Sequence, residues 1–201
     1  MRGRKTPRPD RAAAETAIET LLRYLGQDTT REGLRGTPRR VLKAWEEHTS
    51  GYAEDPAEIL GVSFGETEGY QGLVVLAGVP FVSHCEHHLA PIVGTVDLGY
   101  LPGDRVVGLS KLARLVDVFA RRLQLQERMT AEIATALETH LKPKGCGVVV
   151  RATHHCMMAR GVRKVGASMR TSDLRGVFRD DPATRAEFER LVLQGGPTPS
   201  G

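Results

Sequence analysis

Two cysteines and a histidine, placed far apart in the chain, constrain most strongly how this sequence can fold. Cys85 and His88 stand three residues apart, and Cys156 follows much later, directly after two histidines. If the three bind one metal, the fold must bring the two segments together. Structural zinc sites normally have four protein ligands, whereas catalytic sites keep one position for water. Three ligands with an open position predict a metal that activates water for hydrolytic chemistry.

Two other interpretations of these residues stay open. A structural zinc ion could be closed by a fourth ligand, for which His87, His155 and Cys146 are candidates. The cysteines could also be ordinary buried residues beside surface histidines. His84 and His155 each directly precede a cysteine, and successive side chains of an extended segment point to opposite faces. We therefore expect both histidines to be structural. A set of two cysteines and one histidine favours zinc without excluding iron or cobalt.

Composition indicates where such a protein works. Three cysteines, two of them beside histidines, fit a reducing cytoplasm and a metal better than a disulfide framework. The basic N-terminus lacks the apolar stretch of a signal peptide. No run of about 18 apolar residues could cross a bilayer. We therefore expect a cytoplasmic protein with no membrane partner.

The pattern along the chain predicts the architecture. Residues 1–10 and 195–201 are expected to be disordered tails, 11–50 an N-terminal helical segment and 51–194 the catalytic domain. Helices are predicted over 11–25, over 37–48 with Thr37 as N-cap, from the N-cap Ser110 onwards, after Gln126 and over 183–193. Strands are predicted over 72–81, 91–101 and 147–153, and between 163 and 172. The order β-β-α-α-β-β predicts an α+β fold with paired helices on one face of an antiparallel sheet.

Two further histidines are candidates for proton transfer. His87 lies beside a presumed metal ligand, and His154 lies two residues from another. An imidazole in such a place can shuttle protons near neutral pH. It can equally support the ligands without taking part in chemistry.

Cations and a carboxylate indicate an anionic substrate. Lys111 and Arg114 are one turn apart at a helix start, where they oppose the helix dipole unless an anion binds there. Solvated side chains are the alternative. Arg160 adds a cation four residues after Cys156. Glu127, in the first turn of the next helix, could accept two hydrogen bonds from a guanine-like edge, although its position is also ordinary for an acidic residue.

Six strings of residues together resemble the zinc-dependent GTP cyclohydrolase I family, in the order of the family and from about residue 12 to 194. They are Gly33-Leu34-x-x-Thr37-Pro38-x-Arg40, Ser83-x-Cys85-Glu86-His87-His88, Gly108-Leu109-Ser110-Lys111-Leu112-x-Arg114, Gln124-x-Gln126-Glu127-Arg128, His154-x-Cys156-Met157 and Arg160-Gly161-Val162. Two departures are Met169, where the family usually has Thr, and His84, where small or apolar residues are common. His84 could therefore compete as a ligand.

The resemblance implies a tunnelling-fold (T-fold) subunit in a homodecamer with active sites between subunits. It implies the conversion of GTP and water to 7,8-dihydroneopterin triphosphate and formate, the first step of pterin and tetrahydrofolate biosynthesis. The implied roles are zinc ligands for Cys85, His88 and Cys156; catalysis for His87 and His154; triphosphate binding for Arg40, Ser110, Lys111, Arg114 and Arg160; and guanine binding for Gln126 and Glu127.

Two other classes of protein compete with this interpretation. A T-fold reductase acting on a deazaguanine would need a free nucleophilic cysteine instead of a metal set. A non-enzymatic, zinc-stabilised module that binds nucleic acid would show a continuous basic face with interleaved aromatic residues. Aromatic residues are only 5% of this chain, and its cations outside the N-terminus cluster with the metal motifs. We therefore expect no nucleic-acid partner.

Overall fold

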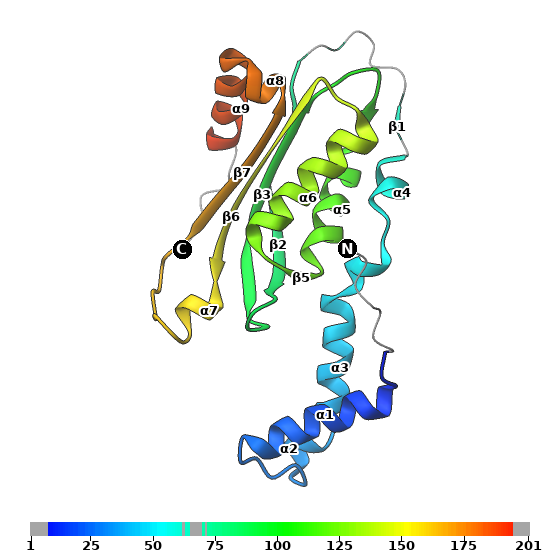
Figure 1. Ribbon diagram of the computed structural model, residues 1–201, viewed down its shortest axis with the longest axis vertical. Helices are drawn as coiled ribbons and strands as arrows, with labels where there is room; N and C mark the ends of the chain where they lie inside the picture. Colours follow the sequence, from blue (N-terminus) through cyan, green and yellow to red (C-terminus); the bar gives the residue numbers. More distant parts are fainter. Residues whose placement is uncertain (1–7, 62, 65–69, 71, 195–201) are drawn as a thin grey trace. The chain divides into compact units, whose positions relative to one another are not determined.

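A computed structural model of the chain describes residues 8–61, 63–64, 70 and 72–194 (Figure 1). The chain divides into two compact units, Met1–Thr49 and Ser50–Gly201. Residues 1–7 and 195–201, which make up most of the tails expected from the sequence, lie outside the described residues.

The first unit is helical. Its helices are α1 (Arg11–Tyr24), α2 (Glu32–Arg35) and α3 (Thr37–His48). Asp10 is the N-cap of α1, because its side chain accepts a hydrogen bond from the backbone N–H of Ala13 at 2.7 Å. Arg11 forms an ion pair with Glu46 of α3, with 2.9 Å between Nη1 and Oε1. Pro38 lies in the first turn of α3, where a missing N–H removes no helical hydrogen bond.

The second unit is built on a five-stranded sheet in the order β5-β2-β3-β6-β7. Its strands are β2 (Val74–Cys85), β3 (Pro91–Leu101), β5 (Leu123–Gln124), β6 (Gly145–His154) and β7 (Met169–Gly176). All neighbours in this sheet are antiparallel except β5, which runs parallel to β2. Two short strands, β1 (Ser63–Phe64) and β4 (Val106–Val107), form a separate antiparallel pair.

Two long helices cover one face of the sheet, as Figure 1 shows. The helical elements of this unit are η1 (Ser50–Ala53), α4 (Pro56–Gly61), α5 (Leu109–Ala120), α6 (Gln126–Ala136), η2 (Leu137–Leu141), α7 (His155–Met158), α8 (Val177–Asp180) and α9 (Pro182–Gln194). Leu112 and Leu115 of α5 and Ile133 of α6 are fully buried in one cluster with Val148 and Val150 of β6. The predicted α+β architecture, with paired helices on one face of a mainly antiparallel sheet, is therefore confirmed.

A second, smaller core lies on the other face of the sheet. Val149 packs there although Val148 and Val150 face α5 and α6, because successive side chains of a strand point to opposite faces. The rings of Phe178 in α8 and Phe188 in α9 are fully buried and stand edge to face, with centroids 5.1 Å apart. These two helices therefore anchor the C-terminal part of the chain to the sheet.

Some element boundaries differ from the sequence-based expectation. The N-cap of α5 is Gly108, whose φ of −62° and ψ of 142° are extended, so Ser110 lies inside the first turn and the predicted N-cap is wrong. The N-cap of α3 is likewise Gly36 and not Thr37. The strand predicted over 72–81 continues to Cys85, because residues 83–85 are buried between β3 and β5. A polar residue inside a sheet cannot be distinguished from a loop residue by its pattern alone.

Among the described residues, no helix is both long enough and apolar enough to span a membrane.

Candidate metal centre and active site

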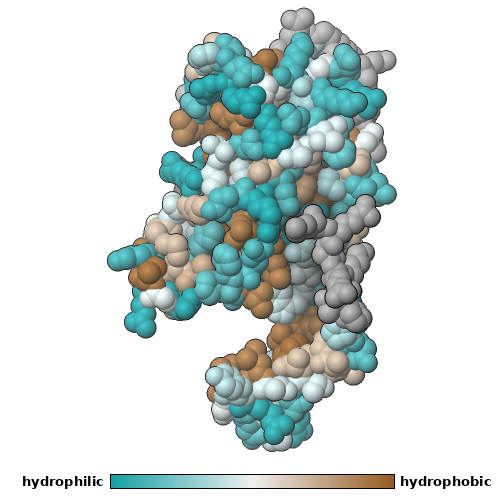
Figure 2. Space-filling model, in the orientation of Figure 1, coloured by the Kyte–Doolittle hydropathy of each residue, from teal (hydrophilic) through white to brown (hydrophobic). Residues whose placement is uncertain are grey.

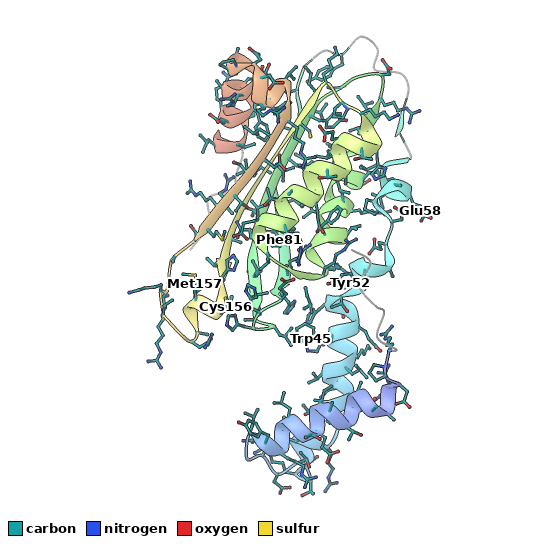
Figure 3. The ribbon with its side chains drawn as sticks, in the orientation of Figure 1. Trp45, Tyr52, Glu58, Phe81, Cys156 and Met157 are labelled. Carbon is teal, nitrogen blue, oxygen red and sulfur yellow. The ribbon has the colours of Figure 1, made fainter. Side chains whose placement is uncertain are left out.

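The candidate metal ligands come together at one end of the sheet. Strands β2 and β6 are both antiparallel to β3, so they run in the same direction and end at the same edge of the molecule. Cys85 is the last residue of β2, and His154 is the last residue of β6. The chain then turns into α7, which carries Cys156, labelled in Figure 3.

The three side chains form one donor cluster. The donor atoms of Cys85, His88 and Cys156 all lie within 4.8 Å of one another, and no other described residue joins the group. The sulfur of Cys85 is 3.7 Å from Nδ1 of His88. Ligand atoms of a tetrahedral zinc site with usual bond lengths are about 3.5–3.8 Å apart. The residues present therefore fit a metal, which His88 would bind through Nδ1.

The three side chains of the cluster differ in burial, and their surroundings affect the pKa of a thiol. Cys85 is buried, Cys156 is half-buried and His88 is exposed, so the cluster faces solvent on the histidine side. Burial raises the pKa of the Cys156 thiol, and the neighbouring sulfur of Cys85 raises it further. This raised pKa disfavours the thiolate form of Cys156. A metal ion reverses this, since the thiolate is the ligand form.

The other cysteine and histidines near the motif lie in different surroundings. Cys146 is buried in β6, where its sulfur is 3.7 Å from the carbonyl oxygen of Ala134, and burial raises its pKa to about 12. It pairs with Tyr100 at the end of β3 opposite to the metal cluster, so it is too far away to close the site. His84 is buried within β2 and is outside the donor cluster. His87 is exposed, and its ring stands edge to face with that of His88 at 6.1 Å.

His154 is held by a buried amide. Nε2 of Gln126 lies 3.2 Å from the carbonyl oxygens of Val150 and Met169 and from Oγ1 of Thr171. Carbonyl oxygens only accept, so they fix which end of the amide carries the hydrogens, and Oε1 must face the histidine. Oε1 lies 2.8 Å from Nε2 of His154, which is therefore the donor. Nδ1 is the remaining nitrogen through which His154 can meet a substrate.

Glu127 projects outward at the start of α6. Its side chain is exposed, and its negative charge raises the pKa of His154, although the larger effect of burial lowers that pKa. The two groups therefore lie near each other. No side chain caps the N-terminus of α6, and the first N–H groups of a helix have no intrahelical partner. A carboxylate and free N–H groups thus stand side by side near His154, the last residue of β6.

The residues predicted to bind triphosphate are not gathered in one place. Ser110, Lys111 and Arg114 lie in the first turns of α5, a helix about 17 Å long. The last residue of α5 is Ala120, and β5 then pairs with the metal end of β2. The three residues therefore lie at the far end of α5 from the metal cluster. The exposed Arg160, by contrast, follows α7 at the metal end.

Arg40 belongs to the first unit and has local partners. Its Nη2 donates to the carbonyl oxygen of Gly33 at 3.0 Å and to Oγ1 of Thr37 at 2.9 Å. The guanidinium thus braces the connection between α2 and α3. Its role toward a substrate stays a prediction.

Fold and site together define an α+β protein that carries a candidate metal centre at one end of a helix-covered sheet. Comparison with known families adds that the family model described as GTP cyclohydrolase I matches residues 14–193. The chain belongs to the GTP cyclohydrolase I family. Among solved structures it is similar to one described as the archaeosine synthase QueF-Like in the apo form, with 18% identity and a TM-score of 0.45, over 53% of this chain and 96% of that one.

Proposed function

We propose that the protein opens the imidazole ring of GTP in a zinc-dependent hydrolysis and forms 7,8-dihydroneopterin triphosphate and formate. Membership of the GTP cyclohydrolase I family supports this activity. The observation that carries the proposal is the cluster of Cys85, His88 and Cys156, which offers three donors and no fourth among the described residues. An open coordination position is the mark of a catalytic metal site.

The residues in and around the cluster would each have a separate role in the reaction. Cys85, His88 and Cys156 would hold the metal, which when bound supplies a Lewis acid and lowers the pKa of water. His154, whose Nε2–H donates to Oε1 of Gln126, would hold or deliver a proton at Nδ1 toward the ring nitrogen of the purine. Ring opening gives a formamide, a second hydration releases formate, and the ribose rearranges before the pterin ring closes.

Glu127 would select the base. An exposed carboxylate accepts hydrogen bonds from the N–H and NH₂ groups that guanine presents together, and adenine lacks this pair of donors. A site built for such donors can reject an analogue by up to about 10⁴-fold. The side-chain amide of Gln126 is already bonded within the protein, so its proposed contact with guanine would use its backbone N–H.

The triphosphate would be bound across a subunit boundary. Lys111 and Arg114 lie at the far end of α5 from the metal cluster of their own subunit, whereas Arg160 lies at the metal end. One copy would therefore not bring all the predicted groups to one GTP, and a second copy would supply Lys111 and Arg114. The first unit supports association, because none of residues 8–49 is buried and Leu21, Tyr24 and Leu25 are exposed on it. Figure 2 shows brown side chains gathered on that unit. We propose a homo-oligomer, a decamer by family resemblance.

The proposed function is tested by metal content and GTP turnover measured on the same sample. We expect a metal-loaded protein to release formate and to produce a fluorescent pterin after oxidation of the product. ATP should not react, because adenine lacks the donors that Glu127 would bind. Treatment with a chelator should stop turnover and added zinc should restore it. A fully loaded protein that leaves GTP intact would refute the proposal.

Substitution of Lys111 by alanine is expected to raise the KM for GTP about tenfold or more with a smaller change in kcat. A charge-assisted hydrogen bond to phosphate is lost, while the residues at the metal end are untouched. Steady-state kinetics measure both constants. Arg190→Ala, which removes an exposed cation from α9, is the matched control and should change neither constant. An unchanged KM for Lys111→Ala would remove this residue from the triphosphate site.

Mixed oligomers test whether sites are shared between copies. Lys111→Ala leaves the metal half of a subunit intact, and Cys156→Ser leaves its phosphate half intact. After co-expression in equal amounts, about a quarter of the shared sites should combine two intact halves and bind GTP with the wild-type KM. Turnover at low GTP should therefore exceed that of either variant alone. No gain on mixing would contradict a site built from two subunits.

A further inference from the structure

The turn that carries half of the candidate metal site has few partners of its own. Beyond β2, the N–H of Leu89 donates to the carbonyl oxygen of Cys85 at 2.8 Å, and the N–H of Cys85 donates to that of Ala90 at 2.9 Å. Leu89 has a φ of 54°, a left-handed conformation that costs energy for a non-glycine residue. Residues 86–89 are exposed. Packing alone therefore does not hold His88 in place against Cys156.

Arg128 of α6 reaches this turn. Its Nη2 donates to Oε2 of Glu86 at 2.6 Å and to the carbonyl oxygen of Leu123 at 2.8 Å. The N–H of Glu86 donates in turn to the carbonyl oxygen of Gln124 at 3.1 Å, which continues the pairing of β2 with β5. Glu86 is thus held at both its side chain and its backbone, directly after the ligand Cys85.

Arg128 is itself held by a buried side chain. Its Nε donates to Oε1 of Gln124 at 3.0 Å. Nε2 of Gln124 donates to the carbonyl oxygen of Phe119 at 3.0 Å and to Oε2 of Glu132 at 2.8 Å. Both of these groups only accept, so the orientation of the amide is fixed and its oxygen must face Arg128. The guanidinium has one arrangement in which all these bonds are made.

The first turn of α6 therefore connects the two halves of the metal site. Gln126 binds His154 at the end of β6, two residues before Cys156. Arg128, two residues further along the helix, binds Glu86 beside Cys85. Glu127 lies between them and projects outward.

We propose that Arg128 is a positioning residue of the metal centre, which holds the turn bearing Cys85 and His88 against α6 through Glu86. The proposal rests on the proposed function only in taking Cys85, His88 and Cys156 as metal ligands. Substitution of side chains that hold metal ligands in place typically costs 10–100-fold in metal affinity. An exposed ion pair contributes little to global stability. The pair should therefore control metal retention far more than folding.

The test measures how fast zinc-loaded protein releases zinc into a chromogenic chelator, without GTP. We expect Arg128→Gln to release zinc about tenfold faster than the wild type, with little change in melting temperature. Arg128→Lys keeps the charge and loses the planar guanidinium, and its rate of zinc release should lie between those of the wild type and Arg128→Gln. Glu86→Gln should also release zinc faster, and the double variant should be no faster than Arg128→Gln alone, because both substitutions break the same contact. Excess zinc should restore kcat in each variant.

The matched control is Arg11→Gln, which breaks an exposed ion pair with Glu46 that shares no residue with the metal turn. It should release zinc at the wild-type rate. Wild-type release from both Arg128→Gln and Glu86→Gln would overturn the proposal. So would faster release that only follows a fall in melting temperature, or equally fast release from the control. A protein that holds zinc but leaves GTP intact would instead refute the proposed function, and the release rates would still decide the role of Arg128.

Discussion

Replacement of Cys156 by serine is expected to abolish metal binding and GTP turnover together while the fold persists. A hydroxyl group is a poor zinc ligand, so only two of three donors would remain. The loss of Lewis acid and activated water should lower kcat at least about 10³-fold. Cys156 is half-buried in the short helix α7 and packs only against the edge of the core, so the sheet should not depend on it. Metal per subunit, circular dichroism and formate release measure the three expected effects.

The matched control for this prediction is Cys146→Ala. It removes a thiol of the same type from the buried core at the other end of the sheet, away from the donor cluster. We expect it to lower stability modestly and to keep both metal and turnover. A metal-free Cys156→Ser protein that still converts GTP would refute the ligand assignment. Equal metal loss from both variants would show that the effect comes from damage to the fold.

Replacement of His154 by alanine is expected to leave zinc bound and to lower kcat by about 10²–10⁴-fold, the usual contribution of a positioned acid or base. His154 lies outside the donor cluster, so the metal should remain. The substitution leaves Oε1 of Gln126 without its partner, but the site is only half-buried and water can replace the imidazole. Metal analysis together with single-turnover kinetics separates metal loss from slow chemistry.

His155→Ala is the control for this second prediction, because it removes the neighbouring imidazole from the first residue of α7. It should retain most of the wild-type turnover. Full turnover by His154→Ala would exclude an acid–base role for this residue. A similar loss from both variants would indicate that the end of β6, and not one imidazole, is what the reaction needs.

Local patterns predicted the regular elements well. The apolar spacing of Leu112, Leu115 and Phe119 indicated a helix, and α5 buries all three side chains. Strand β3 has the predicted bounds 91–101. The pattern failed where burial comes from distant partners: β5 and α7 are too short to show a period, and the polar end of β2 is buried only because β3 and β5 flank it.

The candidate site shows the same division. Residue type was enough to name Cys85, His88 and Cys156 as candidate metal ligands, and the structure brings their donor atoms within 4.8 Å of one another. No spacing rule connects Glu86 with Arg128, or Gln126 with His154, because each pair joins segments that meet only in the folded sheet. The sequence thus indicated the candidate ligands and not the side chains that hold them in place.

By itself the sequence indicated which side chains could carry chemistry: two thiols and an imidazole that suit a metal, a carboxylate that could accept hydrogen bonds and cations that could meet an anion. These properties belong to single side chains and to short stretches of backbone. Only the tertiary structure decided which of them meet. Strands β2 and β6 bring the metal ligands to one end of the sheet, whereas α5 takes Lys111 and Arg114 to the other. The reason is that strand direction and helix length act over distances that no local pattern encodes.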